Sequence, residues 1–184
     1  FNMKKLLYIL LFIPVMSFSQ SAFISGNELL CTNSGTADIS VSFNGTAPFT
    51  FVYSINGVNK ADIVTSTNPF IISSDIGGNY DLISFSDAIS VGTISGGAII
   101  TILQAPTAVI SNITDTIHAI DPSLQFTSIS LGNIINQTWN YGDNSGDEII
   151  DNPIHNFPLN AAGLGVASTY QISLIVEDVN SCTD

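Results

Sequence analysis

Carboxylates make up most of the side chains in this sequence that could do chemistry. The 184 residues include fifteen Asp and Glu, but only two His and two Cys. Hard cations such as Ca²⁺ take several oxygen ligands from one loop, and four carboxylates fall close together at Asp143, Asp147, Glu148 and Asp151. Their spacing does not follow the alternate-position pattern of a helix–loop–helix calcium site. We therefore prefer a solvated acidic loop, in which Asp143 accepts backbone N–H groups of a turn, and keep the four residues as a weak calcium candidate.

The two histidines, His118 and His155, have no partner at a catalytic spacing. The sequence contains no Ser-His-Asp or Cys-His arrangement, no H-E-x-x-H motif and no phosphate-binding loop. A histidine without such partners is more often packed than catalytic. We expect no enzymatic activity, no catalytic residue and no cofactor, with calcium as a low-ranked alternative.

Cys31 and Cys182 are the only cysteines. Disulfides form in exported proteins, so a bond between them is the first hypothesis. The two residues lie near opposite ends of the chain and in different expected modules, and their pairing would require the modules to fold back on each other. We therefore favour two unpaired cysteines, or a partner for Cys182 beyond this sequence.

The N-terminal residues predict export. Lys4 and Lys5 form a short basic start, residues 6–15 form an uncharged apolar run, and Ser17 and Ser19 supply small residues at a cleavage spacing. The apolar run is too short to cross a bilayer comfortably, so no membrane insertion is expected once it is removed. Residues 1–19 are thus interpreted as a signal peptide with two upstream residues, and the protein as secreted or exposed on the outer cell surface.

The charge balance excludes some partners. Loss of Lys4 and Lys5 with the signal peptide leaves Lys60 against fifteen acidic residues, a net charge of about −14. Nucleic acids bind through clusters of Lys and Arg, which this chain lacks. We expect an extracellular protein or a polysaccharide as the partner.

Two segments of alternating apolar residues predict β-strands in residues 20–104. Residues 37–43 and 49–55 place an apolar side chain at every second position, and Asn56-Gly57 follows as a hairpin turn. A tyrosine, Tyr80, lies at the start of a late strand of this module. Pro106 then blocks strand pairing and marks a linker, so that a second module covers residues 105–184.

The second module carries the most distinctive pattern. Trp139-Asn140-Tyr141-Gly142-Asp143-Asn144 is followed by residues 152–157 with the sequence N-P-I-H-N-F, and then by a strand pattern led by Tyr170 and ending at Asp178. These three motifs resemble those of the PKD domain, an immunoglobulin-like β-sandwich module that is rarely catalytic. The resemblance implies structural roles in the core and turns for Trp139, Gly142, Asp143, Pro153, His155 and Tyr170.

The first module is similar to a repeat found in large secreted and surface proteins of gliding Gram-negative bacteria. The similarity covers short segments, among them Gly45-Thr46-Ala47-Pro48-Phe49, Tyr80-Asp81-Leu82 and Ser95-Gly96-Gly97-Ala98. It implies a gliding motility-associated cargo of type IX secretion with further modules in the same chain.

The predicted fold class is therefore all-β, with two tandem immunoglobulin-like β-sandwiches after a signal peptide. Residues 179–184 show no apolar alternation, so the second sandwich is expected to lack its last strand and the chain to be a fragment. Two functions fit. The first is a non-catalytic spacer or adhesin segment of a multidomain protein. The alternative is an accessory carbohydrate-binding region of a secreted hydrolase whose catalytic domain lies outside this sequence.

Overall fold

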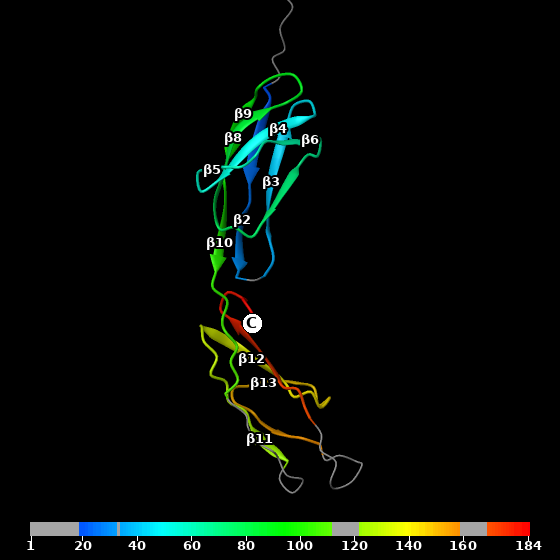
Figure 1. Cartoon of the computed structure of the whole chain (residues 1–184), viewed down its shortest axis with the longest axis vertical. Coiled ribbons are helices and arrows are strands. Elements are labelled where there is room, and N and C mark those ends of the chain that lie inside the picture. Colours follow the sequence, from blue (N-terminus) through cyan, green and yellow to red (C-terminus); the bar gives the residue numbers. More distant parts are fainter. Residues whose placement is uncertain (1–18, 33, 112–121, 159–168) are drawn as a thin grey trace, which may run out of the picture. The chain divides into compact units, whose positions relative to one another are not determined.

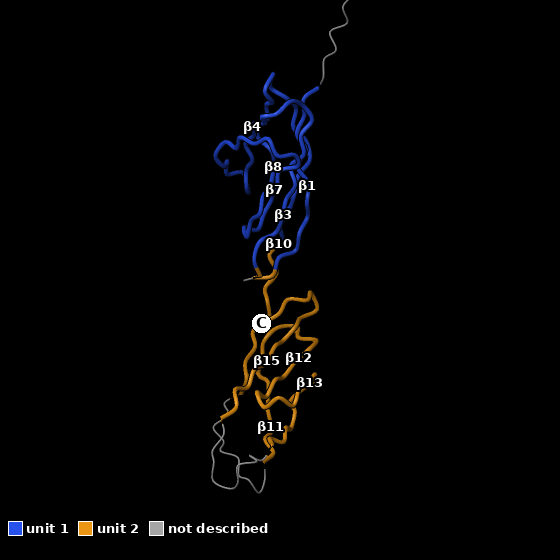
Figure 2. Tube along the Cα trace, turned by 90° about the vertical axis from the view of Figure 1, so that its right-hand side faces the viewer, with its two compact units in different colours: residues 1–30, 35–101 blue, residues 31–34, 102–184 orange. Residues whose placement is uncertain are grey.

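The computed structural model describes residues 19–32, 34–111, 122–158 and 169–184. The predicted signal peptide, except for Ser19, and His118 lie outside these residues. The described ranges contain strands and no helix, hence no helix with the length and apolar character needed to cross a membrane. The chain divides into two compact units, which are coloured separately in Figure 2: residues 1–30 with 35–101, and residues 31–34 with 102–184.

Within its described residues the first unit is built from ten strands, which Figure 1 labels where space allows; the ends of two of them, Cys31 and residues 102–103, cluster with the second unit. They are β1 (Ser21–Ser25), β2 (Asn27–Cys31), β3 (Ala37–Asn44), β4 (Phe49–Ile55), β5 (Val58–Asn59), β6 (Ile63–Thr65), β7 (Phe70–Ser74), β8 (Gly78–Ser86), β9 (Thr93–Gly96) and β10 (Ala98–Leu103). One sheet has the order β7-β3-β1-β9, and the other has the order β2-β10-β8-β4-β5, with β6 also paired to β4.

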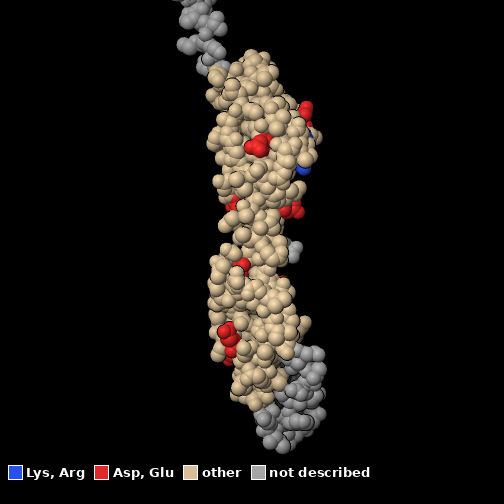
Figure 3. Space-filling view, turned by 90° about the vertical axis from the view of Figure 1, so that its left-hand side faces the viewer, with Lys and Arg blue, Asp and Glu red and all other residues tan. Residues whose placement is uncertain are grey.

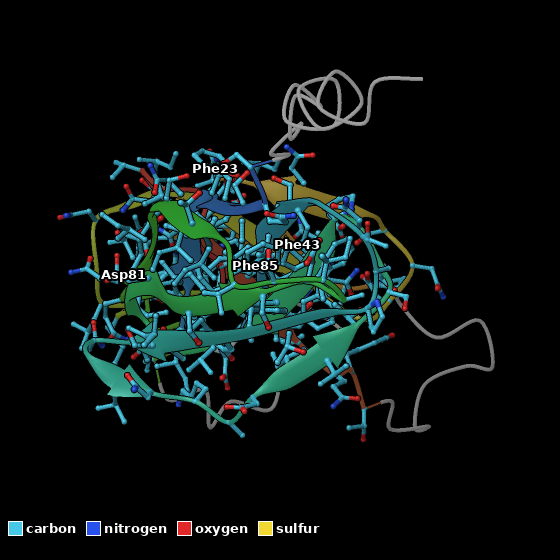
Figure 4. The ribbon with its side chains drawn as sticks, turned by 90° about the horizontal axis from the view of Figure 1, so that it is seen from above. Phe23, Phe43, Asp81 and Phe85 are labelled. Atoms are coloured by element: carbon cyan, nitrogen blue, oxygen red, sulfur yellow. A yellow bond between two sulfur atoms is a disulfide. The ribbon has the colours of Figure 1, made fainter. Side chains whose placement is uncertain are left out.

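Alternating side chains fill the space between these two sheets. Ala37, Ile39, Val41 and Phe43 of β3 are buried, while the residues between them face outward. Phe43 stacks on Phe49 with ring centroids 4.6 Å apart and on Phe85 at 5.6 Å. Figure 4 labels Phe43 and Phe85 in the interior, and Phe23, which is partly exposed, on the outside. The period-two pattern of the sequence thus places a row of aromatic rings in the core.

Two chain segments at the sheet edges cross from one sheet to the other. β1 and β2 belong to different sheets and are joined by Gly26, and β9 and β10 likewise belong to different sheets and are joined by Gly97. Gly96 has φ +85°, and a Cβ atom there would collide with the Ile24 carbonyl oxygen. Glycine therefore permits both the backbone conformation and the close approach of β1 to β9.

Tyr80 ties the start of β8 to the preceding loop. Its ring is fully buried, and its hydroxyl lies 2.7 Å from the Ile76 carbonyl oxygen and 2.7 Å from Ser74 Oγ. The hydroxyl donates to the carbonyl and accepts from the serine. This is the corner bond of a tyrosine at the start of a late strand in a β-sandwich.

The described part of the second unit contains five strands in two sheets. They are β11 (Ser123–Gln125), β12 (Ile134–Asn140), β13 (Asp147–Ile149), β14 (Ile154–Asn156) and β15 (Ser173–Asp178). β11 pairs with β14, and a second sheet has the order β13-β12-β15. A core cluster joins them, made of Phe126, Trp139, Tyr141, Phe157, Leu174 and Val176. The prediction of an all-β chain with two tandem sandwiches is confirmed.

The chain turns back after β15. The Val176 N–H donates to the Asp184 carbonyl oxygen at 2.9 Å, and the Asp184 N–H donates to the Val176 carbonyl oxygen at 3.1 Å. Residues 182–184 thus run antiparallel along the second half of β15, although the sequence of residues 179–184 has no apolar alternation. Backbone pairing does not need that alternation, because it uses only main-chain groups.

Candidate functional site

The predicted motif residues of the second unit meet around the turn that follows β12. Trp139, at the end of β12, is fully buried, and its indole N–H donates to the Ile150 carbonyl oxygen at 3.1 Å. Its ring packs against Phe126 with centroids 5.6 Å apart. The Trp side chain therefore has its polar atom satisfied and its ring removed from solvent.

Gly142 allows the turn to approach the neighbouring chain. Its φ is +70°, and a Cβ atom there would lie 2.5 Å from the Gln171 carbonyl oxygen. Asn144, the last residue of the first motif, adopts a similar φ of +66°. Both conformations lie in the left-handed region, which Gly and Asn tolerate best.

Asp143 links the turn to β14. One carboxylate oxygen, Oδ2, lies 2.7 Å from Nε2 of His155. The other, Oδ1, accepts from the Ser145 hydroxyl at 2.6 Å and from the Ser145 N–H at 3.0 Å. Both side chains of the Asp143–His155 pair are almost entirely buried. A buried polar pair of this kind is stable only because its atoms are hydrogen-bonded.

The second motif, N-P-I-H-N-F at residues 152–157, contains the short strand β14, and its residues alternate between buried and exposed. Pro153, His155 and Phe157 are buried, while Ile154 and Asn156 between them are exposed. The His155 ring stacks on Tyr141 with centroids 3.7 Å apart and meets the edge of Phe157 at 4.8 Å. The imidazole therefore fills a place in an aromatic layer and presents one nitrogen to Asp143.

The electrostatics of the cluster follow from these contacts. Burial acts to raise the pKa of Asp143, but the hydrogen bonds from Ser145 and His155 outweigh it and lower the pKa to about 2. Burial, and then the Glu148 carboxylate that accepts from the Tyr141 hydroxyl at 2.8 Å, raise the pKa of Tyr141. Asp143 is therefore ionised and Tyr141 is neutral at ordinary pH.

This arrangement is not that of a nucleophile and its base. In hydrolases of the Ser-His-Asp type the imidazole lies between the hydroxyl and the carboxylate and takes the proton of the nucleophile. Here Asp143 lies in the middle, between the Ser145 hydroxyl and the His155 ring. The imidazole thus bonds the carboxylate and not the serine hydroxyl, and the cluster holds the turn against β14.

The structure does not gather the four carboxylates of the candidate calcium loop. Neighbouring residues of a strand point to opposite faces, and Asp147 and Glu148 are neighbours in β13, opposite Asn140 and Trp139 respectively. Each of the four accepts a bond from the protein, Asp147 from Asn140 at 2.6 Å and Asp151 from Gln137 at 2.8 Å. Within the described ranges, no three His, Cys, Asp or Glu side chains are grouped as a metal site would require.

Tyr170, the last of the predicted motif residues, lies at the rim of the same core. Its ring stacks on Phe157 with centroids 4.8 Å apart, and its hydroxyl lies 3.4 Å from the Pro158 carbonyl oxygen. The bond is longer than the corner bond of Tyr80 in the first unit.

The expectation of two unpaired cysteines is wrong. Cys31 and Cys182 form a disulfide, with Cα atoms 5.6 Å apart. The error came from assigning Cys31 to the first module, because residues 31–34 cluster with the second unit. The Thr32 N–H donates to the Leu103 carbonyl oxygen at 2.9 Å, which holds this segment beside the end of β10. No return of one module onto the other is needed.

Asp178 is a structural residue that sequence reasoning did not single out. Its Oδ1 accepts from the Asn180 N–H at 2.8 Å and from the Cys182 N–H at 2.9 Å. Burial acts to raise the pKa of Asp178, but these bonds and one from the Asn180 side chain lower it. The signal was its place at the end of the alternating strand, where Asp side chains commonly accept N–H groups of a turn.

No protein-family model matches the sequence, and no curated protein matches it. Among solved structures, the fibronectin(III)-like modules of Clostridium thermocellum CbhA share 14% identity and a TM-score of 0.39, with 88% of each chain covered. The N-terminal Ig1-2 module of the Drosophila receptor protein tyrosine phosphatase DLAR shares 12% identity and a TM-score of 0.32, with 91% of this chain and 94% of that chain covered. Similarity at these values does not assign the chain to a family.

Proposed function

We propose that this chain is a non-catalytic N-terminal segment of a secreted or cell-surface multidomain protein and acts as a pair of spacer and adhesion modules. The observation that carries the proposal is that the Asp143–His155 pair has a structural role. The one histidine among the described residues is 6% exposed, packed between aromatic rings and bonded to a carboxylate whose other oxygen holds a turn. The side chains best suited to acid–base chemistry are thus committed to structure.

The exposed surface supports an interaction role. On the outer face of the sheet β13-β12-β15, Ile149, Thr138 and Ile175 lie opposite one another on adjacent strands, and both isoleucines are exposed. Figure 3 shows isolated Asp and Glu side chains, and a little Lys or Arg surface at one edge, on a face made mostly of uncharged residues. An uncharged face with apolar residues suits contact with protein or polysaccharide better than contact with nucleic acid.

The PKD resemblance and the type IX secretion context are part of the same proposal. The first is supported by the motif residues, which meet in one cluster at the turn after β12. Further modules of the same chain and an outer-surface location are proposed from the sequence. A fusion of residues 3–30 to a reporter should reach the periplasm and be cut near Ser19, whereas an uncut cytoplasmic reporter would contradict export.

The function is tested on the full chain with both activities measured on one sample. We expect retention on an extracellular protein or polysaccharide from the producing cell's surroundings, and no release of product from peptide, ester or glycoside substrates. Hydrolysis that is lost in a His155→Gln variant of unchanged fold would overturn the proposal. Hydrolysis that survives both the substitution and repurification of the sample would overturn it as well.

The alternative of an accessory carbohydrate-binding region rests on one exposed ring. Trp139 cannot stack on a sugar because it is buried, but Phe23 is 48% exposed on the outer face of β1. Its neighbours across the sheet are Ser42 and Ser95. Sugar binding that is lost in Phe23→Ala and kept in Ile71→Ala, a matched exposed residue of the same sheet, would favour this alternative.

A further inference from the structure

The disulfide closes a very large part of the chain into one covalent loop. Cys31 and Cys182 are 151 residues apart in sequence. Every strand from β3 to β15 lies between them, and only β1 and β2 come before the loop. The cores of both units are thus largely made of residues inside the loop.

This connectivity determines which residues carry tension. A force applied through the N-terminal end and through Asp184 follows the shortest covalent path. That path runs along β1 and β2 to Cys31, crosses the two sulfur atoms to Cys182, and leaves through residues 183–184. We propose that the Cys31–Cys182 disulfide is a mechanical shunt, which keeps tension off residues 32–181 when the chain is stretched from its ends.

The load on the first unit falls on its first two strands. β1 is paired with β3 on one side and with β9 on the other, and its Ala22 and Ile24 side chains are fully buried. If both strands were pulled out, residues 19–30 would extend by roughly 40 Å at most. The remaining strands of the unit would stay off the load path.

The load on the second unit falls on its C-terminal turn. Cys182 is fully buried, and its N–H is held by the Asp178 carboxylate at 2.9 Å. Residues 183–184 pair with the second half of β15. Beyond these two residues the force reaches the second unit only through the sulfur atoms, so neither of its sheets lies in series with the load.

Without the disulfide both units would lie in series. Residues 19–184 could then extend to a length on the order of 600 Å. The extended path through residues 19–31, the disulfide and residues 182–184 is only about 60 Å long, so the shunt changes the reach of the stretched chain about tenfold. Cys31 is half-buried and lines a polar cavity of about 370 Å³ within the second unit, with Thr32 and Asp184 among the lining residues.

The linkage is tested first, with a protease. Beyond Lys4 and Lys5, Lys60 is the one Lys or Arg of the sequence, and it lies between the two cysteines. Free thiols are alkylated, the full chain is denatured, and a lysine-specific protease is added. We expect fragments ending at Lys60 and beginning at Ala61 that stay joined until a reductant is added. Fragments that separate without reductant would overturn the proposal.

The mechanics are tested next by stretching single molecules between handles placed before Ser21 and after Asp184. The oxidised chain should lengthen by no more than about 40 Å up to forces that unfold the reduced chain, and the reduced chain by several hundred ångströms. A Cys31→Ser/Cys182→Ser variant should match the reduced chain. Should that variant not fold, the reduced native sequence still gives the comparison. A gain of several hundred ångströms in oxidised molecules, or equal gains in both states, would refute the shunt.

The inference goes beyond the proposed function, and only its biological use rests on the spacer role. The mechanical test needs no ligand, whereas the functional test needs no force. An oxidised chain that extends fully would refute the shunt, but the same chain could still bind its partner without hydrolysing it. An oxidised chain that is protected by the disulfide could still prove to be an enzyme, which would refute the proposed function alone. The two failures are therefore distinguishable.

Discussion

The two units reach similar architectures with different means of stabilisation. The first has a large apolar core in which Ile, Val and Phe side chains from both sheets are buried. The second, within its described residues, has a smaller apolar cluster, to which it adds the buried Asp143–His155 pair, the Tyr141–Glu148 bond and the disulfide. Small cores supply less stabilisation, and cross-links or polar networks commonly supplement them. We therefore expect the second unit to be more sensitive to single polar substitutions and to pH.

The largest effect is expected from removing the central ring of the second unit. Trp139→Ala should destabilise that unit by about 3–5 kcal/mol because of the cavity that it leaves. The loss of stability is measured by chemical denaturation, followed by a separate fluorescent probe in each unit. Phe51→Ala is the matched change in the first unit. A loss below about 1 kcal/mol for Trp139→Ala would mean that the ring is not part of the core.

The pH dependence of the second unit should be governed in part by Asp143. Its folded pKa of about 2 lies below the ordinary value of about 3.9 for an unfolded chain. The ionised carboxylate therefore stabilises the fold fully above about pH 4, and this contribution is lost as the pH falls towards 2.

Asp143→Asn should lower stability by about 1–3 kcal/mol at pH 7, since a buried charge-assisted bond is lost. Thermal melts between pH 2 and pH 7 should show that the difference in melting temperature between Asp143→Asn and the native sequence becomes smaller in acid. Asp87→Asn is the matched change in the first unit, where hydrogen bonds from Thr46, Ser90 and Ile89 also lower the pKa of a carboxylate that is only half-buried. A constant difference across this range would show that Asp143 does not titrate as described.

Several of these features could be predicted from the sequence because they depend on neighbours along the chain. The strands at residues 37–43 and 49–55 follow from alternation, which the structure reproduces residue by residue in β3. A turn at Gly142 and Asn144 could be predicted because few residues other than Gly and Asn accept a positive φ.

Other features depend on contacts between distant residues and could not be read in the same way. The partner of Asp143 is twelve residues away on β14, which belongs to a different sheet from the β12 strand that precedes Asp143. The disulfide was misjudged because the border between units does not follow sequence order at Cys31. The four carboxylates were kept only as a weak calcium candidate from the sequence, and the alternation of β13, which separates Asp147 from Glu148, could not be read from their spacing.

A smaller effect is expected from the two tyrosines that begin the late strands. Tyr80→Phe should cost the first unit about 1 kcal/mol, because its buried hydroxyl bonds at 2.7 Å. Tyr170→Phe should cost the second unit less than about 0.5 kcal/mol, since its hydroxyl lies 3.4 Å from an acceptor at a more exposed site. Equal losses, measured by denaturant titration of each variant, would show that the corner bond does not distinguish the units.

The smallest effect is expected from calcium, and its test separates a structural acidic loop from a ligand site. A bound cation would raise the melting temperature by mass action, and the second unit offers the loop from Asp143 to Asp151 as the first place to look. Three of the four carboxylates accept bonds from Asn140, Tyr141 and Gln137, and the fourth holds His155. A cation would have to displace these partners and bring side chains from both faces of β13 to one point. We therefore expect the same melting midpoint for the full chain with millimolar calcium and with chelator. A rise that is absent in Asp147→Asn, and still present in the exposed control Asp62→Asn of the first unit, would establish a calcium site and make the second unit a cation-dependent module.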